Sequence, residues 1–169
     1  MPEQTEFSQE EIHSADLAEQ LFRSGAACSQ AVVLSQAERL ELPKDLCANL
    51  TLGLGGGVAR SRQICGCVSG YALLAGICHG SGLTFSPEAK AETYASVQAF
   101  LAQFKAAFKS TTCGELLALR AESAKAAADD AATPSERTQT YYHHRAGCIQ
   151  CIRFAASMAA RLPVPRKQS

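Results

Sequence analysis

Alanine is the residue type that most constrains the fold of this chain. Thirty of the 169 residues are alanine, whereas valine and isoleucine together number eleven. Alanine has the highest intrinsic helix propensity, and β-branched residues are the ones enriched in strands. A chain of this length is typical of one domain and can bury a core without disulfide bonds. We therefore expect an all-α fold, a compact single-domain bundle of about six to seven helices.

Local signals divide the chain into seven expected helices. Ser8, with Glu11 three residues later, predicts a capping box at the first helix start. The expected helices cover approximately residues 8–23, 27–40, 43–52, 65–79, 86–108, 113–119 and 148–161. In the fifth helix, apolar residues at spacings of three and four predict a stripe facing the core. Its members are Tyr94, Val97, Leu101, Phe104 and Phe108.

Two segments are assigned no part in the core. Residues 121–136 contain no Leu, Ile, Val, Phe or Met, which predicts an exposed helix or a connector. Residues 163–169 begin with two prolines close together and continue as a polar tail. We expect both segments to belong to a single cysteine-rich domain over residues 1–169.

Charge and hydropathy argue against several classes of protein. Lys and Arg number 16, as do Asp and Glu, so the chain has no basic field for nucleic acid. The first twenty residues lack the basic and apolar regions of a secretory signal. No apolar window of eighteen residues occurs, as a membrane span would require. We expect a cytoplasmic protein without nucleic-acid binding or membrane insertion.

Eight cysteines are the unusual feature of the composition. In a reducing cytosol, a cysteine-dense chain more often binds metal or performs redox chemistry than forms structural disulfides. Free cysteines also occur as small buried hydrophobic residues. For Cys47 and Cys78 this simpler interpretation is preferred.

Four of the cysteines lie in the expected first turn of a helix. They are Cys28, Cys65, Cys113 and either Cys148 or Cys151. A helix N-terminus carries unpaired N–H groups and the positive end of the dipole, so we expect a lowered thiol pKa there. Four thiolates around one point form the ligand set of a structural zinc ion or an iron–sulfur cluster.

Cys148 and Cys151 form the one CxxC motif, and both sulfurs would face the same side of a helix. No histidine follows Cys151, so the haem-attachment pattern is absent. His143 and His144 are better interpreted as solvated turn residues than as ligands. His79 is better interpreted as a partner of its helix's C-terminal dipole.

A glycine run at residues 54–58 is followed by Arg60 and Arg62. It lacks the Lys-Ser/Thr pair of a phosphate-binding P-loop, and no strand is expected before it. Close packing of backbone around the cysteines explains the glycines better than nucleotide binding does.

In combination, these motifs resemble a known family. Cys28 occurs in GAACSQAV, Cys65 in CGCVSG, Cys113 in TCGELL and Cys151 in CIRFAA, with the glycine run 54–58 before the second motif. The pattern is similar to the C-GCAxxG-C-C family, small bacterial and archaeal helical proteins to which a redox role is assigned. The match covers roughly residues 17–160. A related domain in split-Soret cytochrome c accompanies an iron–sulfur centre, so the resemblance implies a cluster held by these four cysteines.

The chain departs from the family pattern at its additional cysteines. Cys67 stands where the family motif has alanine, and Cys47, Cys78 and Cys148 are further additions. Cys67 and Cys148 adjoin signature positions and are candidate auxiliary ligands. On an ideal helix, Cys67 and Cys78 fall within about 20° of one face. Eight cysteines could therefore form two four-thiolate sites or one larger cluster.

Three functions are consistent with these features. The preferred one is an electron carrier or redox module with an iron–sulfur cluster, its nuclearity and number left open. The second is a cluster-free thiol–disulfide protein or sensor. The third is a protein that binds zinc or a soft metal ion such as copper(I). We expect a redox partner protein, allow for a homodimer, and expect an oxidoreductase if the chain is an enzyme.

Overall fold

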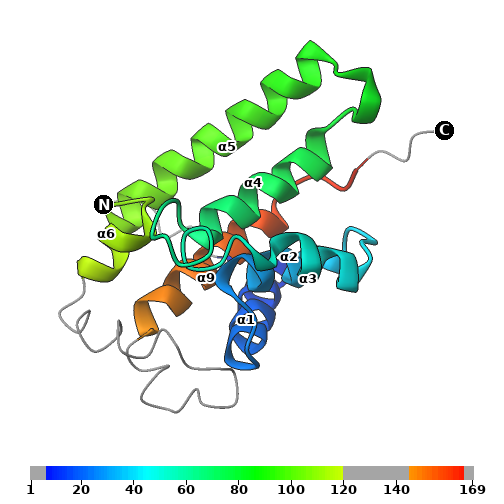
Figure 1. The fold of residues 1–169 in the computed structure, drawn as a ribbon. Helices are drawn as coiled ribbons and strands as arrows, with labels where there is room; N and C mark the ends of the chain where they lie inside the picture. Colours follow the sequence, from blue (N-terminus) through cyan, green and yellow to red (C-terminus); the bar gives the residue numbers. More distant parts are fainter. Residues whose placement is uncertain (1–6, 120–144, 166–169) are drawn as a thin grey trace.

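The computed structural model describes residues 7–119 and 145–165. Within these ranges the chain forms seven α-helices and a short 3-10 helix, Gly82–Thr84, with no β-strand (Figure 1). The helices are α1 (Gln9–Arg23), α2 (Cys28–Ala37), α3 (Lys44–Leu52), α4 (Gly66–His79), α5 (Pro87–Phe108), α6 (Cys113–Ala118) and α9 (Ala146–Ala160). The predicted all-α fold is confirmed. No helix in these ranges is long and apolar enough to cross a membrane. The expectations for 121–136, His143 and His144 concern residues outside the described ranges.

The predicted capping box begins α1. The backbone N–H of Glu11 donates to Ser8 Oγ at 3.3 Å, and the Ser8 N–H donates to a carboxylate oxygen of Glu11 at 2.7 Å. The helix ends before Gly25, whose φ of +110° is in the region that favours glycine. The sequence therefore specifies both ends of this helix.

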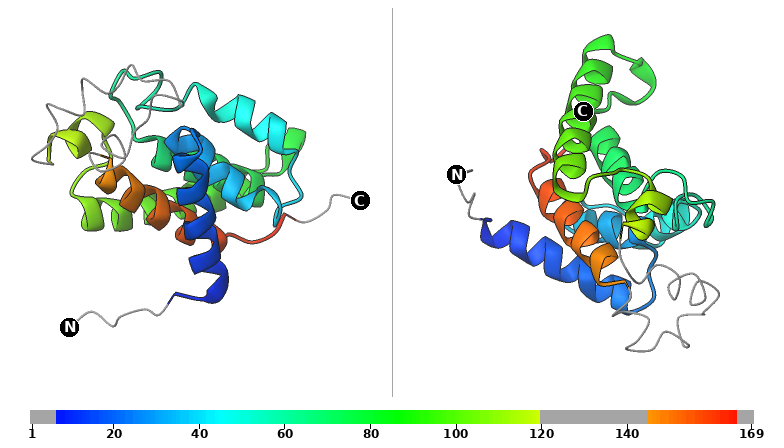
Figure 2. Two further views of the ribbon diagram at one scale, coloured as in Figure 1. Left: turned by 90° about the horizontal axis from the view of Figure 1, so that it is seen from below. Right: turned by 90° about the vertical axis from the view of Figure 1, so that its left-hand side faces the viewer.

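The core forms around α9, which lies between α1 and the hairpin of α4 and α5 (Figure 2). Ala155, Ala156 and Ala159 of α9 are fully buried. Their small side chains allow neighbouring helices to approach closely. The alanine content therefore contributes to tertiary packing as well as to helix formation.

An aromatic cluster joins α5 to α4 and α9. Phe100 and Phe104 are fully buried, and the ring of Phe100 stacks on Tyr71 with centroids 3.9 Å apart. Phe154 of α9 contacts the predicted stripe at Phe104 and Phe108. The stripe prediction is wrong for Tyr94, which is 57% exposed. Tyr94 lies about 15 Å along the helix from Phe104, where α9 covers the stripe.

A cation just after α2 holds the C-terminal end of α9. The Arg39 guanidinium donates to the Ala159 carbonyl at 3.0 Å and to the Leu162 carbonyl at 2.9 Å. Carbonyls at a helix C-terminus lack partners within the helix. Arg39 supplies donors from outside the helix, in addition to the Leu162 N–H that also donates to the Ala159 carbonyl, and fixes the end of α9 against the residues that follow α2.

Ion pairs fasten α1 to α9. Arg161 donates to the Glu11 carboxylate, and Arg153 lies 2.8 Å from carboxylate oxygens of both Asp16 and Glu19. Burial raises the pKa of Glu11, but the hydrogen bonds from Arg161 and Ser8 outweigh it and lower the pKa below its ordinary value. The Glu11 carboxylate therefore stabilises the fold in its charged form.

Candidate functional site

Cysteines occupy three of the helix starts as predicted. Cys28 is the first residue of α2, Cys65 is the N-cap of α4, and Cys113 is the first residue of α6. On α9 the two candidates separate, because Cys148 is the third residue and Cys151 the sixth. Cys148 lies in the first turn, and Cys151 lies beyond it.

Six cysteines from these four helices and their N-caps line one small cavity. Its volume is about 20 Å³, and its remaining lining is apolar side chains and glycine. The cysteines are the four signature residues and both auxiliary candidates: Cys28, Cys65, Cys67, Cys113, Cys148 and Cys151. Among the described residues, the lining includes no nitrogen- or oxygen-bearing side chain. We call this set of six residues the cysteine cluster.

The cavity has room for about one water-sized sphere. In residues 7–119 and 145–165, no group of three or more His, Cys, Asp or Glu side chains is arranged to hold a metal ion. A polynuclear group would require the walls to move apart. One wall of the cavity is α6, a helix of six residues. Leu116 is its one buried residue, so this helix is held to the core by few contacts.

Cys47 and Cys78 lie outside the cysteine cluster and are buried elsewhere in the core. Cys67 and Cys78 are both buried on α4, but eleven residues separate them, which is about 16 Å along a helix. Cys78 lines a different cavity, together with His79 and Glu92. The structure therefore does not divide the eight cysteines into two sets of four.

A left-handed loop between α3 and α4 shapes one side of the cysteine cluster. Six of its residues have positive φ: Gly56, Gly57, Val58, Ala59, Arg60 and Arg62. For a non-glycine residue this conformation costs roughly 1–2 kcal/mol. Backbone bonds hold the loop in this form, including Ala59 N–H to Gly53 O at 2.9 Å and Gln63 N–H to Gly57 O at 3.0 Å.

The same loop pairs with the start of α6 and so connects two cysteines. The Cys113 N–H donates to Gln63 O at 2.7 Å, and the Cys65 N–H donates to Thr111 O at 2.8 Å. An antiparallel bridge between Ile64 and Thr112 lies between these bonds. Backbone pairing therefore holds Cys65 and Cys113 in one place although they are distant in sequence.

Glycines permit this close approach. A Cβ at Gly57 would lie 2.7 Å from Cys113 Cβ and 2.7 Å from the Gln63 backbone nitrogen. A Cβ at Gly66 would lie 3.1 Å from the Ser29 nitrogen and 3.3 Å from Cys28 Cβ. The predicted role of the glycine run in backbone packing around the cysteines is confirmed at Gly57, and Gly66 has the same role outside that run.

The electrostatic expectation for Cys113 is wrong. Burial raises the pKa of its thiol, and Arg62, whose Nη1 donates to Cys113 Sγ at 3.8 Å, lowers it by less. The N-terminus of a six-residue helix does not compensate for removing the thiolate from water. The pKa of Cys67 also lies well above its ordinary value, because its thiol hydrogen-bonds to Cys28 and Cys65 and is fully buried.

Arg62 is a site residue that the sequence did not connect with the cysteines: a phosphate-binding role was set aside, and no other role was predicted for it. Its contact with Cys113 depends on the left-handed loop and on pairing across about fifty residues. No local motif encodes that contact.

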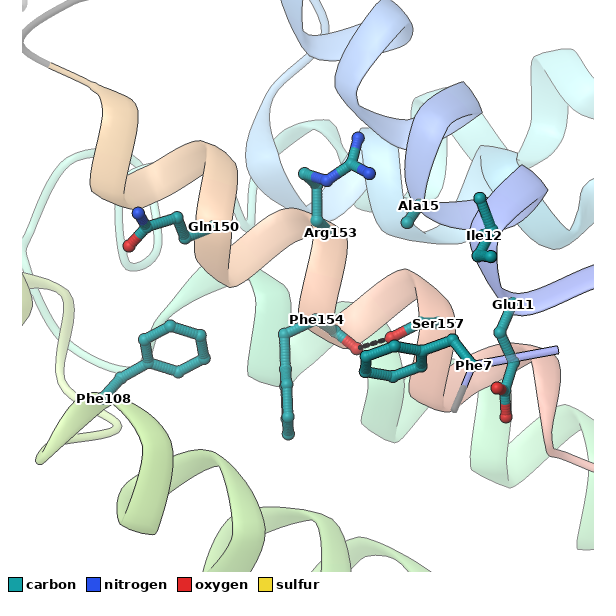
Figure 3. A pocket seen from close by; sticks show the side chains of 9 residues that line it. All are labelled: Phe7, Glu11, Ile12, Ala15, Phe108, Gln150, Arg153, Phe154 and Ser157. Atoms are coloured by element: carbon teal, nitrogen blue, oxygen red, sulfur yellow. Dashed lines mark hydrogen bonds between the residues drawn. The ribbon is translucent and has the colours of Figure 1, made fainter. Parts of the chain in front are cut away.

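A second cavity, of about 310 Å³, lies between α1, α5 and α9 (Figure 3). It is mostly apolar, with Phe7, Phe108 and Phe154 in its lining. Gln150 also lines it, whereas the neighbouring Cys151 lines the cavity of the cysteine cluster. The two cavities therefore lie on different faces of α9.

The fold and the site define an all-α protein with a cluster of buried and partly buried cysteines. The chain matches the family model described as "Putative redox-active protein (C_GCAxxG_C_C)" over residues 26–162. It therefore belongs to this family, as the sequence motifs predicted. No curated protein and no solved structure matches it.

Proposed function

We propose that this chain is a redox module or electron carrier in which Cys28, Cys65, Cys113 and Cys151 hold an iron–sulfur cluster. The observation that supports the proposal is the cysteine cluster, in which thiols from four helices line one cavity that contains no competing donor side chain from the described residues. Thiolates favour iron–sulfur clusters, zinc and copper(I) over harder ions. Membership of a redox family favours iron over zinc, because zinc has no redox chemistry.

The surrounding residues suit such a centre. When bound, the cluster supplies one-electron transfer. The Arg62 guanidinium donates to Cys113 Sγ and offsets the negative charge of thiolates. Leu116 and Leu117 line the same cavity and exclude water from it. Charge, hydrogen bonds to sulfur and exposure to solvent set the reduction potential of iron–sulfur proteins. A redox partner protein in the cytoplasm would exchange the electron.

One observation favours a second candidate, the cluster-free thiol–disulfide protein. The Cys67 thiol lines the same small cavity as the thiols of Cys28 and Cys65, and these two neighbours raise its pKa. Thiol–disulfide exchange needs an attacking thiolate with a second thiol within reach. Against this candidate, the raised pKa of Cys67 reduces its thiolate fraction at neutral pH.

The visible spectrum of anaerobically purified protein separates these candidates. An iron–sulfur protein will be brown, bleach with dithionite, and contain iron and acid-labile sulfide. A colourless protein with stoichiometric zinc, or a metal-free protein that forms a reversible disulfide, would reject the proposal. Cys47→Ala serves as the matched control, since Cys47 is buried outside the cysteine cluster and its loss should leave the spectrum unchanged.

A further inference from the structure

Cys67 differs from the other non-signature cysteines in what surrounds it. It is fully buried in the first turn of α4, it lines the cavity together with Cys28 and Cys65, and its interaction with those two thiols raises its pKa. Cys47 and Cys78 are also buried but do not line the cavity. Two other thiols are therefore the polar partners of Cys67.

The start of α4 can present two sulfurs to one point. Cys65 is the N-cap, Gly66 follows, and Cys67 is the second residue of the helix. Gly66 has no side chain between them, and this backbone lies so close to α2 that a Cβ at Gly66 would be 3.3 Å from Cys28 Cβ. Cys65 and Cys67 can therefore both approach Cys28.

Helix capping does not account for either cysteine. The side chain of Cys65 makes no capping hydrogen bond. The backbone N–H of Cys65 is bonded to Thr111 O, so pairing with the 110–114 segment holds this position whatever its side chain. Either sulfur can be removed while the backbone that presents the other one remains in place.

We propose that Cys67 is a second thiol ligand from the start of α4, sharing with Cys65 the ligand position that the signature motif gives to Cys65 alone. This inference rests on the proposed function. The centre is then held by one thiol each from α2, α6 and α9, and by either of two thiols from α4. The shared position is specific to this chain, because the family motif has alanine where Cys67 stands.

The test compares Cys65→Ala, Cys67→Ala and the double variant with wild type, with Cys113→Ala as the variant that removes an unshared ligand. Cys67→Ala restores the residue of the family motif, so it should fold, and far-UV circular dichroism checks the fold of every variant. Two readouts are used. One is iron per chain after anaerobic reconstitution. The other is Co²⁺ affinity of the reduced, metal-free chain, followed by thiolate charge-transfer absorption, which does not depend on cluster assembly.

Both single α4 variants should retain the iron content of wild type and bind Co²⁺ within about threefold of it. The double variant and Cys113→Ala should each bind Co²⁺ more weakly by at least about tenfold, a loss that even outer-shell changes can cause. If either single variant, Cys65→Ala or Cys67→Ala, loses as much Co²⁺ affinity as the double variant, the position is not shared. A double variant that binds like wild type would also overturn the inference. Wild-type protein that takes up no iron refutes the proposed function, while the Co²⁺ comparison still decides the role of Cys67.

Discussion

Replacing Gly57 by alanine should destabilise the protein and disrupt the cysteine cluster at the same time. Gly57 has a φ of +71°, and a Cβ there would lie 2.7 Å from both Cys113 Cβ and the backbone nitrogen of Gln63. Neither neighbour is the flexible end of a side chain. The Gln63 carbonyl also accepts the Cys113 N–H, so a shift of one residue displaces the other.

The magnitude follows from these two effects. Alanine in the left-handed backbone conformation costs roughly 1–2 kcal/mol. Overpacking a closely packed site costs roughly 1–3 kcal/mol. Together, Gly57→Ala should lower the free energy of unfolding by about 2–5 kcal/mol, a large part of the roughly 5–15 kcal/mol typical of a domain. Iron uptake should fall as well, because the Cys113 sulfur moves away from the others.

The assay is equilibrium unfolding in urea, followed by far-UV circular dichroism, with iron content measured on the same preparations. Gly76→Ala is the matched control, because Gly76 lies inside α4 and a Cβ there would meet nothing within 4 Å. In a helix interior that change should stabilise by roughly 0.5–1 kcal/mol. Gly57→Ala protein with the stability and iron content of wild type would refute the close packing described here.

Three further predictions follow from contacts and burial. Arg39→Met removes the guanidinium donor from the Leu162 carbonyl and one of the donors from the Ala159 carbonyl, which keeps the Leu162 N–H, so urea unfolding should show a loss of about 1–3 kcal/mol. The exposed pair of Arg23 is the control, and an Arg23→Met variant that loses as much would contradict this account. The folded-state pKa of Glu11 is lowered, so its contribution is complete above the ordinary carboxyl pKa and is lost as pH falls through the folded value. Glu11→Gln should therefore flatten the acid side of a plot of melting temperature against pH, and an unchanged slope would show that Glu11 contributes little. Cys47→Ala and Cys78→Ala should leave iron content unchanged, and a loss of iron in either would place a ligand outside the cysteine cluster.

Local chemistry predicted most of the helical framework. The structure has the Ser8 capping box that the sequence predicts, and Gly25 after α1 and Ser86-Pro87 at the start of α5 likewise act over a few residues. Tyr94 shows the limit of periodicity, because a stripe is buried only where another helix crosses it.

The candidate site depends on contacts that local patterns do not encode. Backbone pairing between residues 62–65 and 111–114 holds Cys65 beside Cys113, and it requires a loop with left-handed residues other than glycine. The thiol pKa of Cys113 likewise depends on burial, which a helix-start pattern does not report. Motifs identified the cysteines, and long-range packing determines their environment.

The most direct test of the central claim is iron K-edge X-ray absorption of the anaerobically reconstituted protein. It reports the elements bound to iron, whatever the number of iron atoms. If the cysteine cluster holds the centre, the first shell will contain sulfur alone, because nitrogen and oxygen side chains do not line the cavity in the described part of the chain. A first shell with nitrogen or oxygen ligands would contradict an all-thiolate site.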